Sequence, residues 1–220
     1  MNKVFPKMFA WLFAGILLSF GVAMYVTNDI NLLYKLYKTS SYIIIIILEF
    51  ITVLIFSTRI HKMSYAGAIF AYLFYSFLTG LTLSSVFLVY DITSIIYAFG
   101  ITAGLVLLLS LFGFFTKIDL TKISTYLFLG LLGIIICSII NIFVNNSTFD
   151  FALLIIGVII FIGYIAYDIQ IVKENMYGLD EEKLPLMGAL ELYMDFINLF
   201  IRLIQLFGKR RDWFSFLLIF

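Results

Sequence analysis

The sequence has little charge, one cysteine, one histidine and two prolines. Only 12% of its 220 residues are Asp, Glu, Lys or Arg, about half of what soluble domains carry, so water is not the main solvent of this chain. The single cysteine, Cys137, excludes an internal disulfide and a zinc site built from cysteines. The net charge of +1 and the lack of a long basic run give no sign of nucleic-acid binding.

What the chain has instead is a series of long apolar runs. Hydrophobic residues make up 64% of it, and about 20 apolar residues span a bilayer as a helix. Seven runs are candidates: 6–27, 41–58, 64–88, 92–116, 123–144, 150–172 and 189–208. The gaps between them are too short for a soluble domain. We therefore predict an all-α membrane protein with seven transmembrane helices, in a single polytopic domain over residues 1–220.

The positive residues indicate an orientation. The first apolar run follows Lys3 and Lys7, but it is too long for a signal peptide and no A-x-A cleavage site follows, so we expect a retained span. Seven spans put eight Lys and Arg residues on the side of the N-terminus and five on the other side, which favours a cytoplasmic N-terminus. The basic cluster at 209–211 argues the other way. The short loops favour a bacterial plasma membrane.

The last run carries a polar stripe. Glu191, Asp195, Asn198, Arg202 and Gln205 are spaced by four, three, four and three residues, so they fall within about 80° of one helix face. Ionised groups on that face are too costly to expose to lipid. We expect this helix to be central, with the six more apolar spans around it. The alternative is an amphipathic helix lying on the membrane surface.

Other polar residues lie at comparable depths in the predicted bundle. Asp168 is about four residues inside the end of the sixth span and Asp195 about six residues inside the seventh, so both lie roughly 6–9 Å deep on the same side. Arg59 closes the second span at that edge. Glu49 lies deeper, near the level of Asn198, and we expect it to interact with Asn198 or Arg202 at mid-membrane and to restrict an ion path.

Two carboxylates close together in a low dielectric are expected to share a proton, because ionising both is costly. Carboxylate oxygens are also the hard ligands that Ca²⁺ prefers. Asp168 and Asp195 are therefore a candidate proton sensor and a transient Ca²⁺ site, and protonation would weaken any salt bridge to Arg59. The alternative is a structural ion-pair network that holds the bundle together.

At these residues the sequence resembles a known family. "ALELYMDFINLFIRLIQLFG" (189–208) closely resembles the last span of the Bax inhibitor family, the transmembrane BAX inhibitor motif proteins. "YIAYDIQIV" resembles its sixth span, and "YLFYSFLTGLTLSSVF" (72–87) its third. The resemblance covers nearly the whole chain. The departures are Ile169, where a Thr is expected, and the apolar tail "DWFSFLLIF" (212–220), whose role the sequence leaves open.

The resemblance implies six helices around a central seventh and a pH-sensitive calcium leak. Asp168 and Asp195 match the aspartate pair that acts as pH sensor and gate, and Arg59 matches the arginine of the second span that latches it. Glu49 matches that span's acidic residue. With the last-span residues Glu191, Asn198 and Arg202, it is assigned to the ion pathway. Ca²⁺ is expected as the permeant ion, with no cofactor.

Three other functions stay open. An intramembrane aspartyl protease would also use two aspartates, and Tyr167-Asp168 fits one half of its motif, but Asp195 lacks the G-x-G-D setting and the P-A-L element is absent. We therefore do not expect an enzyme. A proton-coupled cation exchanger would use the same carboxylates, although no inverted repeat is visible. The third is a regulatory membrane protein that acts through partner helices, because the family resemblance links eukaryotic relatives to suppression of cell death. The expected partners are the bilayer, Ca²⁺ and H⁺.

Overall fold

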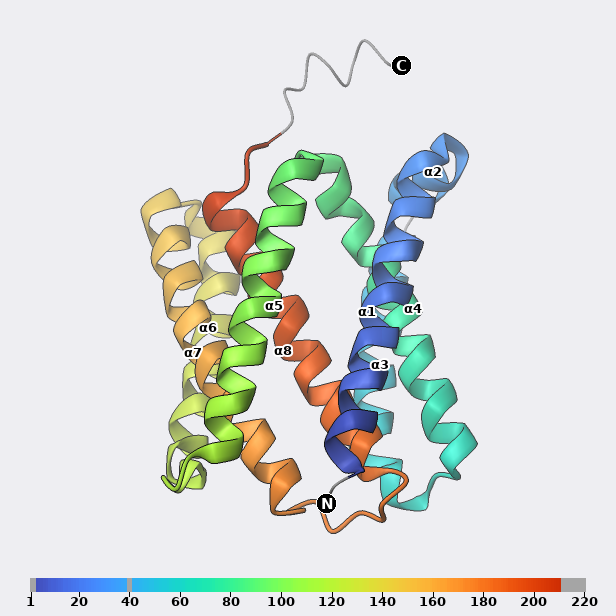
Figure 1. Cartoon of the computed structure of the whole chain (residues 1–220). Helices are drawn as coiled ribbons and strands as arrows, with labels where there is room; N and C mark the ends of the chain where they lie inside the picture. The colour runs from blue at the N-terminus through green and yellow to red at the C-terminus, as the bar shows by residue number, and fades with distance from the viewer. Residues whose placement is uncertain (1–2, 39–40, 211–220) are drawn as a thin grey trace. The chain divides into compact units, whose positions relative to one another are not determined.

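The computed structural model describes residues 3–38 and 41–210, and every element of regular secondary structure within them is a helix (Figure 1). The predicted all-α class is confirmed. The chain divides into two compact units. Of the described residues, unit 1 comprises 3–38, 41–92, 177–193 and 210, and unit 2 comprises 93–176 and 194–209. The tail 212–220 lies outside the described residues, and the single domain over 1–220 stays a prediction.

Seven helical segments of the described residues are long and apolar enough to cross a membrane. They are Val4–Asn28, Ser41–Lys62, Tyr65–Val89, Ile92–Phe115, Leu120–Val144, Ser147–Lys173 and Leu184–Phe207. Each overlaps one predicted span, so the number of transmembrane helices is confirmed. The chain is a multi-pass membrane protein.

Unit 1 is built mainly on the packing of α1 against α4. Its elements are α1 (Val4–Asn28), α2 (Ile30–Lys38), α3 (Ser41–Arg59), the 3₁₀ turn η1 (Ile60–Lys62), α4 (Tyr65–Val89) and residues 184–193 of α8 (Leu184–Phe207). A Cβ at Gly80 of α4 would lie 2.7 Å from the carbonyl oxygen of Ser19 in α1. The two backbones can approach this closely because Gly80 has no side chain.

Helix α2 was not predicted. Residues 28–40 are a gap between two apolar runs, but Asp29 precedes and caps a helix there that begins at Ile30. Its Oδ1 accepts hydrogen bonds from the N–H groups of Asn31 (2.9 Å) and Leu32 (3.2 Å), which is N-terminal capping. Leu33 and Leu36 of α2 are buried in a cluster with Val26 of α1. At nine residues, α2 is far too short to span a membrane.

Unit 2 contains the other helices. They are α5 (Ile92–Phe115), the 3₁₀ turn η2 (Leu120–Ile123), α6 (Ser124–Val144), α7 (Ser147–Lys173) and the later residues of α8. The turn between α6 and α7 is tight because Asn145 adopts the left-handed conformation (φ 52°) and Asn146 caps α7 by accepting hydrogen bonds from Thr148 N and Phe149 N. The two helices therefore form an antiparallel pair.

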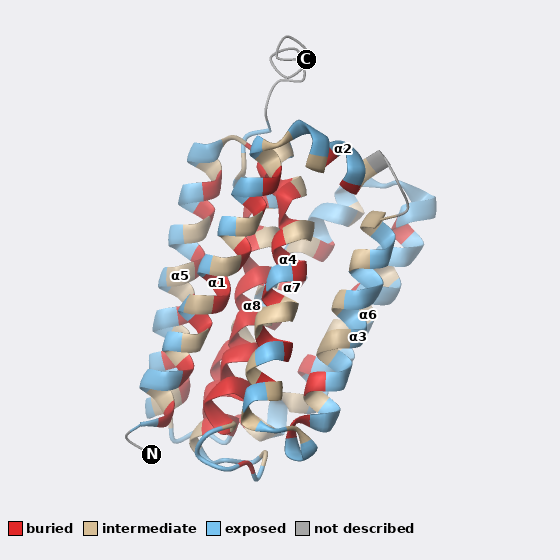
Figure 2. Cartoon of the chain, turned by 90° about the vertical axis from the view of Figure 1, so that its right-hand side faces the viewer, coloured by how far each residue is buried: buried red, intermediate tan, exposed pale blue. Residues whose placement is uncertain are grey.

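Helix α8 begins at Leu184, five residues earlier than predicted. Pro185 is its second residue, where proline removes no helical hydrogen bond. Asp180 precedes the helix, and its Oδ1 accepts hydrogen bonds from the N–H groups of Glu182 (3.2 Å) and Lys183 (2.8 Å). Of the seven spans, α8 is the most buried, with 78% of its most apolar stretch buried (Figure 2). This burial is compatible with the expected central position, which stays a prediction.

Candidate functional site

Asp168 lies in the last two turns of α7 and is only 5% exposed. The end of α7 is held in place by Lys173, whose Nζ donates a hydrogen bond of 2.7 Å to the carbonyl oxygen of Phe114 at the end of α5. The same Nζ lies 5.4 Å from the centroid of the Phe114 ring, a cation–π contact. The backbone that carries Asp168 is therefore fixed against α5 within unit 2.

Gln170, two residues after Asp168, has a structural role that the sequence did not indicate. Its Oε1 accepts a hydrogen bond from Leu120 N at 2.7 Å, and its Nε2 donates one to the carbonyl oxygen of Ile118 at 3.0 Å. Gln170 is 4% exposed. It satisfies two backbone groups of the turn between α5 and η2, and so ties that turn to α7.

Asp195, the second predicted carboxylate, lies on α8 in unit 2 and is also 5% exposed. Its neighbour Phe196 packs edge-on against Phe99 of α5, with ring centroids 5.3 Å apart. Both aspartates therefore belong to the same unit and are buried to the same extent.

Arg202 connects α8 to α7. Its Nη1 donates a hydrogen bond of 3.2 Å to the carbonyl oxygen of Leu153, and its guanidinium carbon lies 5.4 Å from the centroid of the Phe161 ring. The guanidinium lies directly against Gly157, where any Cβ would overlap it. Arg202 Nε has no hydrogen-bond partner among the described residues. Three residues of one face of α7 thus hold the half-buried Arg202 side chain.

Within unit 2, α8 runs antiparallel to α7. Lys209, just after α8, donates its N–H to Ser94 Oγ at 2.9 Å, near the beginning of α5. The end of α7 is bonded to the opposite end of α5 through Lys173. The ends of α7 and α8 therefore lie at opposite ends of α5.

This direction gives an estimate of the register between the aspartates. Arg202 marks the level of Leu153 and Gly157 on α7. At 1.5 Å per residue, Asp195 lies about 10 Å from that level, and Asp168 lies about 16 Å from Gly157 and about 22 Å from Leu153, all toward the end of α7. The two levels therefore differ by about one to two helical turns. Because Cβ atoms lean toward the beginning of their own helix, the two side chains lean toward each other. The register is compatible with the expected pair, and the pairing itself stays a prediction.

The remaining members of the α8 stripe differ in exposure. Glu191, in unit 1, is half-buried, whereas Asn198 and Gln205, in unit 2, are exposed. The Nδ2 of Asn198 donates to the carbonyl oxygen of Met194 at 2.8 Å, within its own helix. The stripe is therefore not uniformly buried, although the sequence pattern treats its five positions alike.

Glu49, in the middle of α3, has a hydroxyl partner in unit 1. Thr79 Oγ1 of α4 donates a hydrogen bond of 2.6 Å to Glu49 Oε1. Thr79 is 2% exposed and Glu49 is half-buried. The acidic group that the sequence placed at mid-membrane is therefore turned toward α4.

A cluster of hydroxyl groups joins three helices of unit 1. Ser19 Oγ of α1 donates to the carbonyl oxygen of Ser76 in α4 at 2.6 Å and is also hydrogen-bonded to the Tyr193 hydroxyl of α8. A serine has one hydroxyl proton, so Tyr193 is the donor in the second bond. The Tyr193 ring also packs edge-on against Tyr72 and Tyr75 of α4. These contacts fix the first half of α8 against α1 and α4.

The model of the family "Inhibitor of apoptosis-promoting Bax1" matches residues 1–212. The chain belongs to the Bax inhibitor family. Among its relatives, the inner membrane protein YbhL of Escherichia coli K12 is 38% identical over 218 residues, covering 96% of this chain and 93% of YbhL. Uncharacterised proteins of Borreliella burgdorferi and Rickettsia prowazekii are 39% and 36% identical, with coverage of 92% or more of each chain.

In this member of the Bax inhibitor family, Arg59 is the last residue of α3 and is exposed. It belongs to unit 1, whereas Asp168 and Asp195 belong to unit 2, so its role as a latch stays a prediction. The interaction of Glu49 with Asn198 or Arg202 stays a prediction for the same reason. Within residues 3–38 and 41–210, no group of three or more His, Cys, Asp and Glu side chains is arranged to hold a metal ion.

The hydroxyl cluster could not be predicted from the sequence. Ser19, Ser76 and Tyr193 lie in apolar runs, where isolated hydroxyl residues are common and usually bond to their own helix. The partner of Glu49 was equally hidden, because Thr79 is one of several hydroxyl residues on α4. In both cases the partner is chosen by helix packing, which a single sequence does not display.

Proposed function

We propose that this member of the Bax inhibitor family is a pH-sensitive, calcium-permeable leak in which Asp168 and Asp195 form the sensor and gate. The observation that carries the proposal is the burial of both carboxylates, each 5% exposed, on two helices of one unit that run antiparallel. Taking two separate carboxylate charges out of water is costly. A shared proton or a bound cation removes that cost.

Ca²⁺ and H⁺ compete in this mechanism because both neutralise the same oxygens. When the shared proton leaves, the pair gains affinity for Ca²⁺ and also becomes a partner for a cation of the protein. Arg59 supplies that cation and acts as the latch that closes the path. Glu49, Glu191 and the later residues of α8, Asn198 and Arg202, line the path itself.

The hydrogen bond between Thr79 and Glu49 supports a role for Glu49 away from lipid, since it directs the carboxylate toward α4. The relative YbhL is an inner membrane protein of Escherichia coli, which supports a bacterial plasma membrane as the location. We place the N-terminus in the cytoplasm from the distribution of Lys and Arg.

The test is Ca²⁺ entry into liposomes that contain the purified protein, measured with a trapped dye from about pH 5 to about pH 8, the range over which a shared carboxylate proton can leave. Asp168→Asn and Asp195→Asn keep the side-chain shape and remove the charge, so each should flatten the pH response. Glu181→Gln, at an exposed position of the loop before α8, is the matched control and should behave as the native protein. A native pH response in both Asn variants would exclude the pair as sensor.

The latch has its own test. Arg59→Ala should raise Ca²⁺ flux above pH 7, where the pair is most ionised, while Lys62→Ala, another exposed cation close to it in sequence, should not. Unchanged flux in a folded Arg59→Ala variant would remove Arg59 from the mechanism.

The same liposomes separate the alternative functions. A proton-coupled exchanger would move Ca²⁺ only while a pH gradient exists, and a protonophore would stop it. A leak would continue after the gradient is collapsed. No Ca²⁺ flux in the native protein at any pH would favour a regulatory membrane protein.

A further inference from the structure

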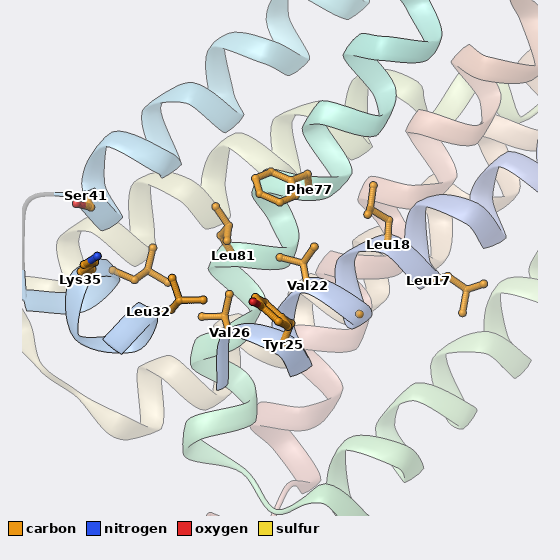
Figure 3. Close-up of a pocket in the computed structure, with 12 residues that line it drawn as sticks. Leu17, Leu18, Val22, Tyr25, Val26, Leu32, Lys35, Ser41, Phe77 and Leu81 are labelled. Carbon is orange, nitrogen blue, oxygen red and sulfur yellow. The ribbon is translucent and has the colours of Figure 1, made fainter. Parts of the chain in front are cut away.

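Unit 1 contains a cavity of about 560 Å³ between α1, α2, α4 and the start of α3 (Figure 3). This volume is within the range of small-molecule binding sites. Of its twelve lining residues, all but Tyr25, Lys35 and Ser41 are apolar or glycine. The cavity therefore has apolar walls and one cationic side chain, that of Lys35.

The polar residues are gathered toward one end. Lys35 and Ser41 lie at one end of the row of side chains, and Leu17 and Leu18 lie at the other (Figure 3). Because α2 joins the end of one span to the beginning of the next and is itself too short to span, Lys35 lies at the boundary between membrane and water. Leu17 is about 16 Å before the end of α1 by helix rise. The cavity thus runs from the level of the lipid headgroups into the hydrocarbon layer.

The part of α2 that borders the cavity is held in position. Leu33 and Leu36 are buried against Val26 of α1, and the Tyr37 hydroxyl lies 2.8 Å from Ser84 Oγ of α4. Burial raises the pKa of Tyr37, so its hydroxyl stays protonated and can donate to Ser84. Lys35 is consequently presented from a helix that is fixed to two spans, rather than from a free loop.

We propose that this cavity binds an anionic phospholipid of the surrounding bilayer, with an acyl chain along the apolar walls and the phosphate paired with Lys35. The positive charge of Lys35 favours an anionic lipid. An uncharged or zwitterionic lipid could place its acyl chain along the same apolar walls but would bring no net negative charge to the ammonium group. The depth of the cavity selects a lipid chain over a soluble anion. This inference concerns unit 1 alone and does not depend on the proposed calcium leak.

The experiment is native mass spectrometry of the full chain in an uncharged detergent, titrated with phosphatidylglycerol or with phosphatidylcholine that carries the same acyl chains. The native protein should bind its first phosphatidylglycerol about fivefold more tightly, as expected for one Lys near an anionic phosphate. Lys35→Gln should bring the ratio of the two affinities close to one, chiefly by weakening the binding of phosphatidylglycerol, whose phosphate charge no choline group offsets.

A second variant tests the apolar walls. Gly21 lines the cavity, and a Cβ there would meet nothing within 4 Å, so a side chain can begin at this position without a clash. Gly21→Leu should occupy part of the space that the acyl chain needs and weaken the first binding step for both lipids. Gly104→Leu on α5 is the matched control, because Gly104 is also exposed and open to a Cβ, and it should bind as the native protein does.

Two results would overturn the proposal. One is equal affinity of the native protein for the two lipids. The other is a preference for phosphatidylglycerol that survives both Lys35→Gln and Gly21→Leu, since the headgroup and chain would then be bound elsewhere. Should Gly21→Leu fail to fold, Lys35→Gln on the α2 surface still decides the headgroup, because it removes charge and not packing.

Discussion

The contact between the Arg202 guanidinium and Gly157 lets us predict how Gly157→Ala changes the free energy of unfolding. The guanidinium of Arg202 occupies the space that a Cβ at position 157 would need. The atoms that must move are at the far end of a flexible side chain, so the variant can fold. To make room, the guanidinium must leave the carbonyl oxygen of Leu153, now 3.2 Å from Nη1, and the ring of Phe161.

The magnitude follows from three contributions. A hydrogen bond from a charged donor contributes about 1.5–3 kcal/mol, and a cation–π contact about 0.5–2 kcal/mol. Arg202 is only half-buried, so the lower values apply and the combined loss is about 2 kcal/mol. Replacing a helical glycine with alanine returns about 1 kcal/mol. The free energy of unfolding should therefore fall by about 1 kcal/mol in Gly157→Ala.

The assay is equilibrium unfolding in detergent micelles, followed by circular dichroism, for Gly157→Ala alone and combined with Arg202→Ala. In the Arg202→Ala background the atoms that would overlap the new Cβ are absent, so Gly157→Ala should stabilise by about 1 kcal/mol, and the coupling between the two positions should be about 2 kcal/mol. Gly104→Ala, at an open helical glycine, should stabilise in both backgrounds. If Gly157→Ala stabilised the native protein as much as Gly104→Ala does, Arg202 would not be held against α7 as described.

Three further predictions concern polar groups elsewhere. Hydrogen bonds from the Lys183 N–H, and secondarily the ion pair with its ammonium, hold the pKa of Asp180 below its ordinary value. Its contribution is therefore fully present above the unfolded pKa of about 3.9 and is lost as pH falls through the lower pKa of the folded protein. Asp180→Ala should lower the unfolding temperature at pH 7, and its difference from the native protein should shrink as the pH is lowered below about 3.9. Gln170→Leu leaves two backbone groups of the α5–η2 turn without partners and should cost about 2 kcal/mol in the same unfolding assay; a loss as small as that of an exposed substitution would contradict the described bonds. Thr79→Val should cost about 1–3 kcal/mol in the native protein and clearly less in a Glu49→Leu background, and equal costs in both backgrounds would show that the two side chains do not interact.

The transmembrane helices were predictable because a bilayer sets the length of an apolar run, and that length is visible in one sequence. One helix boundary was predicted wrongly, the start of α8, and the local sequence explains why. Residues 184–188 contain Pro185 and Gly188, which are typical of a loop, so the last span was begun at 189. Helix α8 includes these residues because proline is tolerated in a first turn and Asp180 caps the turn before it. The shift also places Asp195 about 16 Å from the helix start by helix rise, deeper than the 6–9 Å expected.

The candidate site was predictable in its residue types and only partly in its contacts. The stripe on α8 follows from spacing alone, and the burial of Asp195 agrees with a face turned away from water. What holds Arg202 could not be anticipated: its partners are a backbone carbonyl and the space above a glycine on α7. Neither has a side chain that a pattern could display, and both depend on how α7 and α8 pack in unit 2.

Helix α2 is not visible in the hydropathy of the sequence, but other features of the sequence indicate it. In "NDINLLYKLYK" (28–38), Asp29 stands in the capping position, and Ile30, Leu33 and Tyr37 recur at helical spacing. Averaging hydropathy over the length of a span hides this pattern, because the polar face of α2 offsets its apolar face. A short amphipathic helix between two spans is most stable at the membrane boundary, where its apolar face packs against the neighbouring spans. That placement is what puts Lys35 beside an apolar cavity, so the segment that appeared to be only a connection carries the charge that distinguishes one lipid from another.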